Sequence, residues 1–193
     1  MGYFFYKRII DIFISLIILI LILPFLIPIL FLNFILTIQF PIFFQTRAGL
    51  YGKPFKLIKI KSMLDISHNK KINRHYFLGN FLRRYKIDEL PQLLNVIKGD
   101  MSLVGPRPLY IEYNITYTIN EKKRLLTKPG ITGLAQVKLN DSSKWRNKFK
   151  FDTWYVNNQS LKLDFYILIL TIILIFRIIF FKKKLIEVHT LKI

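Results

Sequence analysis

Two adjacent carboxylates, Asp88 and Glu89, lie between two groups of basic residues in the middle of the chain. The first group consists of Arg83, Arg84 and Lys86. The second is the segment Gly105-Pro106-Arg107-Pro108, which fixes an arginine between two prolines. An arginine guanidinium matches the oxygens of a phosphate in two-point contacts. The pattern therefore suggests chemistry on a phosphate, with a carboxylate as a usable nucleophile.

The local pattern predicts that this pair lies at the beginning of a helix. From Leu90 onward apolar residues recur at helical spacing, and Lys98-Gly99 provides a C-terminal stop. Asp88 is a good N-cap residue, and Pro91 is tolerated in a first turn. Because a helix N-terminus favours anions, we expect its dipole and the nearby arginines to hold Asp88 ionised. The alternative is a structural cap with arginines that only improve solubility.

The composition indicates a membrane surface. The 193 residues suffice for one domain, and they combine a formal net charge of +19 with 52% hydrophobic residues. A basic tail is not this hydrophobic and a soluble domain is seldom this basic, so a surface of anionic lipid is the natural environment. The absence of cysteine excludes a disulfide framework and a Cys-based metal site. No nucleic-acid partner is expected, because the basic residues flank apolar segments and no nucleic-acid module is recognisable.

The first apolar run, residues 9–38, contains a single charge and would extend about 45 Å as a straight helix. A bilayer core needs only about 20 residues. Pro24 and Pro28 stand one turn apart and predict a kink or a reversal. Basic residues lie at both ends, which places both ends in the cytoplasm. A re-entrant hairpin that turns at the prolines satisfies all three observations; the alternative is one long tilted span with its N-terminus outside.

A second apolar run, residues 165–181, contains Arg177 and is followed by three lysines at 182–184. Its basic flanks favour a helix that lies at the membrane interface, although 17 residues could almost span a bilayer. The chain thus divides into three parts. These are a re-entrant membrane helix (1–40), a cytoplasmic catalytic domain (41–164), and an interfacial helix with a basic tail (165–193).

Between the apolar runs, residues 41–61 predict a β-hairpin with strands at 42–46 and 55–61 and a turn at 49–52. Lysines partly alternate with apolar residues in its second strand. This suggests one basic face, either for solvent and lipid headgroups or for a nucleotide phosphate.

The polar segment from Asp65 to His75 predicts a loop, and residues 78–85 predict a short amphipathic helix. The glycines of residues 127–133 are expected to let the backbone approach a ligand closely. His68 and His75 have no paired ligand pattern and are expected at the surface.

The chain resembles the monotopic phosphoglycosyl transferases, also called bacterial sugar transferases, and in particular the small PglC-type enzymes. The resemblance covers nearly the whole chain, and its many ordered matches are far more specific than the carboxylate pair alone. The matching segments are KRIID at 7–11, QTRAG at 45–49, FKLIKIKSM at 55–63, DELPQL at 88–93, KGDMSLVGPRP at 98–108, KPGITGLAQV at 128–137, FD at 151–152, YV at 155–156 and LD at 163–164.

The resemblance implies an α+β, membrane-associated fold. It would combine a proline-broken re-entrant N-terminal helix, a β-hairpin and a mostly helical cytoplasmic catalytic domain with interfacial amphipathic helices. The implied activity, with Mg²⁺ as cofactor, transfers a sugar 1-phosphate from a UDP-sugar to undecaprenyl phosphate and releases UMP. This step would begin glycan assembly at the bacterial inner membrane, with the catalytic domain facing the cytoplasm.

The resemblance also implies roles for individual residues. Asp88 would attack the phosphate attached to the sugar and form a covalent intermediate, which the lipid phosphate then displaces. Glu89 would complete the dyad and share metal or proton handling with Asp88. Arg83 and Arg107 match family positions implicated in phosphate binding. Lys59 and Lys128 stand in matching segments and are likewise expected to contact the substrate.

The chain departs from the family pattern at residues 138–141, which read Lys-Leu-Asn-Asp where many relatives carry an Asn-Gly-Arg-Asn type segment. The role of that loop is therefore not carried over. The helix break also differs, because relatives often have Ser-Pro where this chain has Leu23-Pro24 and a second proline. Anionic lipids are expected partners, and the sequence leaves the oligomeric state open, a homodimer included. A rival function is a non-catalytic membrane-anchored protein that binds lipid or a partner; the intact Asp88, Glu89 and Arg107 argue against it.

Overall fold

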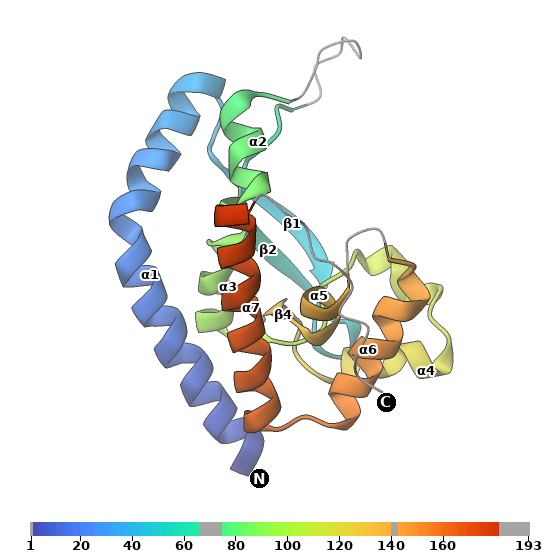
Figure 1. Ribbon diagram of the computed structural model, residues 1–193. Coiled ribbons are helices and arrows are strands. Elements are labelled where there is room, and N and C mark those ends of the chain that lie inside the picture. The colour runs from blue at the N-terminus through green and yellow to red at the C-terminus, as the bar shows by residue number, and fades with distance from the viewer. Residues whose placement is uncertain (1, 66–74, 140–142, 182–193) are drawn as a thin grey trace.

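The computed structural model describes residues 2–65, 75–139 and 143–181. His68, most of the predicted loop before His75, residues 140–141 and the lysines at 182–184 lie outside these ranges. The fold is α+β, as predicted (Figure 1). Its elements are α1 (Gly2–Thr37), β1 (Ile42–Ala48), the 3-10 turn η1 (Leu50–Gly52), β2 (Pro54–Ile60), α2 (Phe77–Arg84), η2 (Ile87–Glu89), α3 (Gln92–Lys98), β3 (Ser102–Val104), η3 (Ile111–Ile115), α4 (Ile119–Lys122), η4 (Lys123–Leu126), β4 (Gly130–Thr132), α5 (Leu134–Lys138), α6 (Trp145–Asn157) and α7 (Leu161–Phe181).

Helix α1 is one continuous helix that passes through Pro24 and Pro28 without interruption. Figure 1 shows it as an arc along one side of the molecule, with both ends curving toward the other elements. Proline removes a helical hydrogen bond and bends the helix at that point. The bend predicted from the two prolines is therefore a curve within α1 and not a turn between two helices. Two of the described helices, α1 and residues 161–180 of α7, are long and apolar enough to cross a membrane.

Polar side chains attach the N-terminal part of α1 to the rest of the protein. The buried Lys7 forms an ion pair of 2.7 Å with Asp164 at the start of α7. Asp11 accepts hydrogen bonds from the Ser102 hydroxyl (2.7 Å) and from the Leu103 backbone N–H (3.2 Å) in β3. These buried charges are paired or hydrogen-bonded, as burial requires.

Two further contacts hold α1 in place. The Arg8 guanidinium donates to the Ile97 carbonyl (2.7 Å) at the C-terminal end of α3, where carbonyls lack helical partners. Near the other end of α1, the buried Asn33 donates its amide to the Lys61 carbonyl (2.8 Å) just after β2. Both ends of the arc are therefore attached to the same group of elements.

Strands β1 and β2 form the predicted antiparallel hairpin, in a register from Ile42 opposite Ile60 to Ala48 opposite Pro54. The lysines of β2 do not all share one face, although Lys59 and Arg47 of β1 do lie on the same face of the hairpin. Lys56 donates to the Thr46 hydroxyl across the strands, whereas Lys59, three residues later, lies on the opposite face and contacts Glu89. Helix α2 confirms the predicted amphipathic helix and directs Leu78 and Leu82 inward.

Strands β3 and β4 pair in parallel, and their glycines allow two backbones to meet. A Cβ atom on Gly130 would clash with the backbone nitrogen of Gly105. The Gly105 N–H donates to the Thr132 carbonyl (2.9 Å), and the Gly130 N–H donates to the Pro106 carbonyl (3.0 Å). The expectation that the 127–133 glycines serve ligand approach is therefore replaced by a structural role: they fix the segment that carries Arg107.

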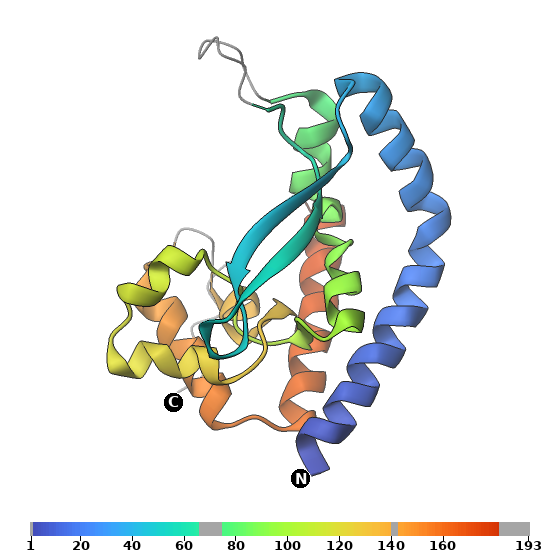
Figure 2. The same ribbon diagram turned by 180° about the vertical axis from the view of Figure 1, so that it is seen from behind.

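Helix α7 lies on the concave side of α1 (Figures 1 and 2). It contributes the fully buried Ile167 to the main core. The predicted boundary between residues 164 and 165 thus falls inside a helix, and the first turns of α7 belong to the same core as the central elements. Other buried members of this core are Leu57, Leu93, Val96, Met101, Leu103, Val104, Leu134, Val137 and Tyr155.

Candidate active site

The carboxylate pair lies in the 3-10 turn η2, and α3 begins only at Gln92 with Pro91 as its N-cap residue. The prediction that Asp88 is an N-cap is therefore wrong. Lys86 takes the left-handed conformation (φ 59°), and the tight turn that follows closes with the Leu90 N–H donating to the Ile87 carbonyl (3.1 Å). The chain thus makes a separate turn before α3. The predicted end of α3 is confirmed, because Gly99 is left-handed (φ 99°).

Glu89 is held by two cations. Its Oε1 atom accepts from the Lys59 ammonium at 3.0 Å and from the Arg107 guanidinium at 2.8 Å. Burial acts to raise the pKa of Glu89, but Arg107 and Lys59 outweigh it and lower the pKa to about 2. Glu89 is therefore ionised throughout the physiological range. The two cations come from β2 and from the proline-flanked segment, so the turn η2 joins both to one carboxylate.

Asp88 has the opposite surroundings. It is buried, and its Oδ1 atom has no hydrogen-bond partner within the described part of the chain. Burial and the charge of Glu89 raise the pKa of Asp88, while Lys59 and Lys86 only partly oppose this. The charges that favour the ionised form of Asp88 are therefore those of Lys59 and Lys86, and not the expected helix dipole and arginines. A buried oxygen without a partner is costly in a folded protein, and it suits an atom that meets a ligand.

The segment that carries Arg107 is held from behind by a buried ion pair. Arg124 pairs with Asp152 of α6 at 2.9 Å, and both side chains are buried. The same guanidinium donates to the Arg107 carbonyl at 2.7 Å and to the Tyr117 hydroxyl at 2.9 Å. Arg124 and Asp152 thus position Arg107 without contacting the carboxylate pair. The family resemblance included Phe151-Asp152, but nothing in the sequence indicated that Asp152 pairs with Arg124.

Two other predicted phosphate contacts do not join the pair. Arg83 donates to the Asn80 side chain (2.9 Å) and contacts the ring of His75, which lies at the surface as expected. The amino group of Lys128 lies beside Gly99 and Arg8, and burial together with Arg8 lowers its pKa. Of the four cations predicted to contact the substrate, the structure brings Lys59 and Arg107 to the carboxylates.

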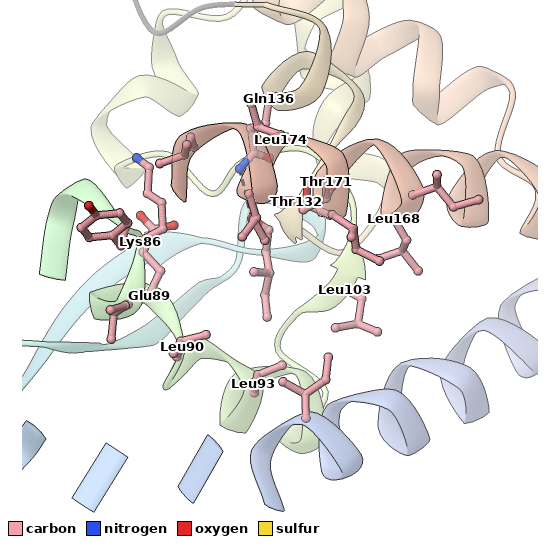
Figure 3. Close-up of a pocket in the computed structure, with 18 of the residues that line it drawn as sticks. Lys86, Glu89, Leu90, Leu93, Leu103, Thr132, Gln136, Leu168, Thr171 and Leu174 are labelled. Carbon is pink, nitrogen blue, oxygen red and sulfur yellow. Dashed lines mark hydrogen bonds between the residues drawn. The ribbon is translucent and has the colours of Figure 1, made fainter. Parts of the chain in front are cut away.

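A cavity of about 1020 Å³ lies beside Glu89 and extends between α1, α3 and α7. Figure 3 shows Lys86 and Glu89 at one end and Leu103 and Leu168 toward the other. Hydroxyl groups of Thr132 and Thr171 bond to each other at 2.7 Å on its wall. The rest of the lining is mainly aliphatic, including Ile14, Ile18, Leu93, Ile172, Ile175 and Ile179. The cavity therefore joins a charged mouth to a long apolar interior.

Such a site suits an enzyme that joins a charged group to an apolar carrier. Residues 2–178 match the bacterial sugar transferase family. The chain belongs to this family and is a transferase.

Named relatives agree with this assignment. The chain is 49% identical over 144 residues to the "uncharacterized sugar transferase EpsL" of Bacillus subtilis (strain 168), a match that covers 71% of each chain. It is 37% identical over 182 residues to a "UDP-glucose:undecaprenyl-phosphate glucose-1-phosphate transferase" of Escherichia coli (strain K12), which covers 86% of this chain and 39% of that protein.

It is also 36% identical over 152 residues to an "undecaprenyl-phosphate galactose phosphotransferase" of Salmonella typhimurium (strain LT2). That match covers 67% of this chain and 32% of the relative. The chain thus spans about two fifths or less of the length of the two relatives named for an undecaprenyl phosphate reaction.

Proposed function

We propose that this protein transfers a sugar 1-phosphate from a UDP-sugar to undecaprenyl phosphate at the cytoplasmic membrane. One observation carries the proposal: a buried carboxylate oxygen of Asp88 without a partner lies next to Glu89, which holds two cations at the mouth of an apolar cavity. The names of the Escherichia coli and Salmonella relatives support the choice of donor and acceptor.

In the first step, an Asp88 oxygen attacks the phosphorus that bears the sugar. A new oxygen–phosphorus bond forms, the bond to the bridging oxygen breaks, and UMP leaves with the electron pair. The product is an aspartyl phosphosugar. Arg107 and Lys59 are fixed in place by Glu89 and supply positive charge where negative charge builds up on the phosphate oxygens.

In the second step, an oxygen of the lipid phosphate attacks the same phosphorus. The bond to Asp88 breaks, the carboxylate is restored, and the phosphosugar is now attached to the lipid. The apolar cavity accepts part of the isoprenoid chain because it removes apolar surface from water. Lys86 at the mouth of the cavity attracts the lipid phosphate.

The two carboxylates fit Mg²⁺. This ion prefers oxygen ligands and is commonly held by one or two carboxylates together with substrate phosphates. Asp88 offers an oxygen without a protein partner, and Glu89 stays ionised, so both would hold the ion. Among the described residues no group of three or more His, Cys, Asp or Glu side chains could hold a metal. Bound there, Mg²⁺ would withdraw negative charge from the diphosphate.

The attachments of α1 support a monotopic arrangement. Lys7 and Asp11 near one end and Asn33 near the other all bind elements of the catalytic domain. A helix that crossed the bilayer once would carry one of these attachments to the far side. We therefore propose that α1 enters one leaflet and returns, and that α7 lies along the interface beside it. Anionic lipid would then contact the basic residues that flank both helices.

The test is a purified protein supplied with Mg²⁺, undecaprenyl phosphate and a panel of UDP-sugars. We expect UMP release with at least one sugar, and no release by Asp88→Asn. The control is Asp65→Asn, which alters an exposed acid paired with Lys61. Normal turnover by Asp88→Asn would eliminate the proposed nucleophile. Failure with every sugar would favour the non-catalytic, membrane-anchored function.

A further inference from the structure

Three aromatic side chains form a row on the surface of η3 and α6. Tyr110 and Tyr113 have ring centroids 6.4 Å apart, and Tyr113 is stacked near Trp145 at 6.5 Å. All three are substantially exposed, with 42, 44 and 52% of their surface accessible. We call Tyr110, Tyr113 and Trp145 the aromatic row.

The inner end of the aromatic row meets the active site through Arg47. The Arg47 guanidinium lies 3.6 Å from the centroid of the Tyr110 ring and donates to the Pro108 carbonyl at 3.5 Å. Pro108 directly follows Arg107, which is paired with Glu89. Because alternate residues of paired strands share a face, Arg47 of β1 and Lys59 of β2 lie on the same face of the hairpin. A line of positive charge thus leads from the carboxylate pair to the row.

The outer end of the row is supported from α6. Trp145 contacts Phe149 at a centroid distance of 5.9 Å, and Phe149 packs edge-on against Tyr117 at 5.4 Å. The Lys148 ammonium lies 4.8 Å from the Trp145 centroid. These contacts hold the rings in place while leaving part of each accessible. Exposed, preorganised apolar surface of this kind marks a binding site.

The position of the row favours an occupant from the aqueous phase. Figures 1 and 2 show α6 and α4 on the side of the molecule opposite α1. The apolar cavity, by contrast, opens between α1 and α7. The lipid and the soluble donor would therefore approach Asp88 and Glu89 from two different sides.

We propose that the aromatic row stacks against the uracil ring of the UDP-sugar, while Arg47 binds the phosphate that leaves with UMP. The inference rests on the proposed function. Attack at the sugar-bearing phosphorus requires the other phosphate and the nucleoside to extend away from Asp88. Cations followed by aromatic rings match that order of phosphate and base. Aromatic rings bind bases because every base presents a π-face.

The binding test uses UMP alone, so that no catalysis is needed. Trp145→Leu and Tyr113→Leu remove stacking but keep apolar bulk, and each should weaken UMP binding about tenfold in calorimetry. Trp145→Phe retains a stacking ring and should keep most of the affinity. The matched control is Phe77→Leu, because Phe77 is an exposed aromatic residue on α2, outside the row.

A spectroscopic test uses the two tryptophans of the chain. In Trp154→Phe the only tryptophan is Trp145. UMP should quench its fluorescence, excited selectively over tyrosine, whereas a sugar 1-phosphate should not. In turnover, Trp145→Leu should raise KM for the UDP-sugar and leave KM for the lipid unchanged.

Unchanged UMP affinity in folded Trp145→Leu and Tyr113→Leu overturns the inference. The inference is also overturned if these variants keep their UMP affinity but lose binding to lipid vesicles or change their oligomeric state. The row would then serve a membrane or a second copy of the chain. Failure of the proposed function gives a different result: UMP binds to the row, but the protein produces no UMP from any UDP-sugar. If the protein releases UMP from a UDP-sugar but the row variants bind UMP normally, the proposed function stands and only this inference is overturned.

Discussion

Asp88 and Glu89 are neighbours in the chain, yet their carboxyl groups have pKa values shifted in opposite directions. Both are removed from water, but Lys59 and Arg107 donate to Glu89, whereas Asp88 keeps an oxygen without a partner. The difference arises because the cations converge on one member of the pair. Glu89 therefore stays charged and fixes the cations, and Asp88 is left for the reaction that we propose.

The first prediction concerns the pH dependence of UMP release. In the proposed mechanism Asp88 must be ionised to attack. Its pKa lies above the ordinary 3.8, so the acid limb of the profile should lie above that value. Lys59 lowers the pKa of Asp88 and Glu89 raises it. Lys59→Met should therefore move the limb to higher pH, and Glu89→Gln should move it to lower pH, whatever their overall rates. If the acid limbs of the measured kcat/KM profiles moved in the same direction for both variants, Asp88 would not be the group that titrates in this limb.

The second prediction is that Asp88→Asn unfolds less readily than the wild type at pH 7. A carboxyl group whose folded pKa is raised above its unfolded value destabilises the folded state once the pH exceeds the unfolded value. Asparagine has similar shape and no charge, so this cost disappears together with activity. Denaturant titration in detergent micelles measures the difference. If the variant were equally or less stable, the charge of Asp88 would not destabilise the folded state.

Glu89 gives the third prediction, with the opposite sign. Its folded pKa of about 2 lies below the ordinary 4.5, so its ion pairs stabilise the fold above pH 4.5 and lose this effect as the pH falls toward 2. The shift corresponds to roughly 3 kcal/mol. Wild-type protein should therefore lose more stability than Glu89→Gln between pH 5 and pH 3. If the two proteins lost the same free energy of unfolding between pH 5 and pH 3, the result would argue against a stabilising role for the ion pairs.

The fourth prediction separates positioning from catalysis. Removing one partner of the buried Arg124–Asp152 pair leaves an uncompensated charge, so Asp152→Asn should cost about 3–5 kcal/mol of stability. It should also slow UMP release, because Arg124 holds the Arg107 carbonyl. The control is Thr118→Ala, which removes an exposed cap of α4 and should cost only about 1 kcal/mol. A fully stable Asp152→Asn protein would show that the pair does not hold the segment.

Local patterns predicted the elements well. Strand alternation with a glycine-containing turn predicted the hairpin, and Lys98-Gly99 predicted the end of α3, where Gly99 is left-handed. The errors concern long-range contacts. Asp88 looked like a cap because it stands just before apolar residues at helical spacing. The basic residues nearby in sequence suggested its charge partners, but Arg107 reaches Glu89 instead, through a segment held by Arg124. The spacing of residues in the sequence does not indicate which of the two carboxylates a distant cation pairs with.

The glycines of residues 127–133 illustrate the same limit. Glycine permits close approach of a backbone, but the sequence does not say to what, and here the neighbour is the Gly105 backbone. The aromatic row was likewise absent from the sequence prediction. Tyr110 and Trp145 are 35 positions apart in the chain and are brought together by the packing of η3 against α6.

The last prediction tests whether both ends of α1 lie on the cytoplasmic side. The chain contains no cysteine, so single cysteines at Phe4 and Lys53 report on the two ends without background. In intact cells, neither Phe4→Cys nor Lys53→Cys should react with an impermeant maleimide added from outside, and both should react after permeabilisation. The reason is that Lys7 and Asn33 attach the two ends of one curved helix to the same domain. Labelling of Phe4→Cys alone in intact cells would mean that α1 crosses the bilayer, and its attachment through Lys7 to Asp164 could not then exist in the membrane.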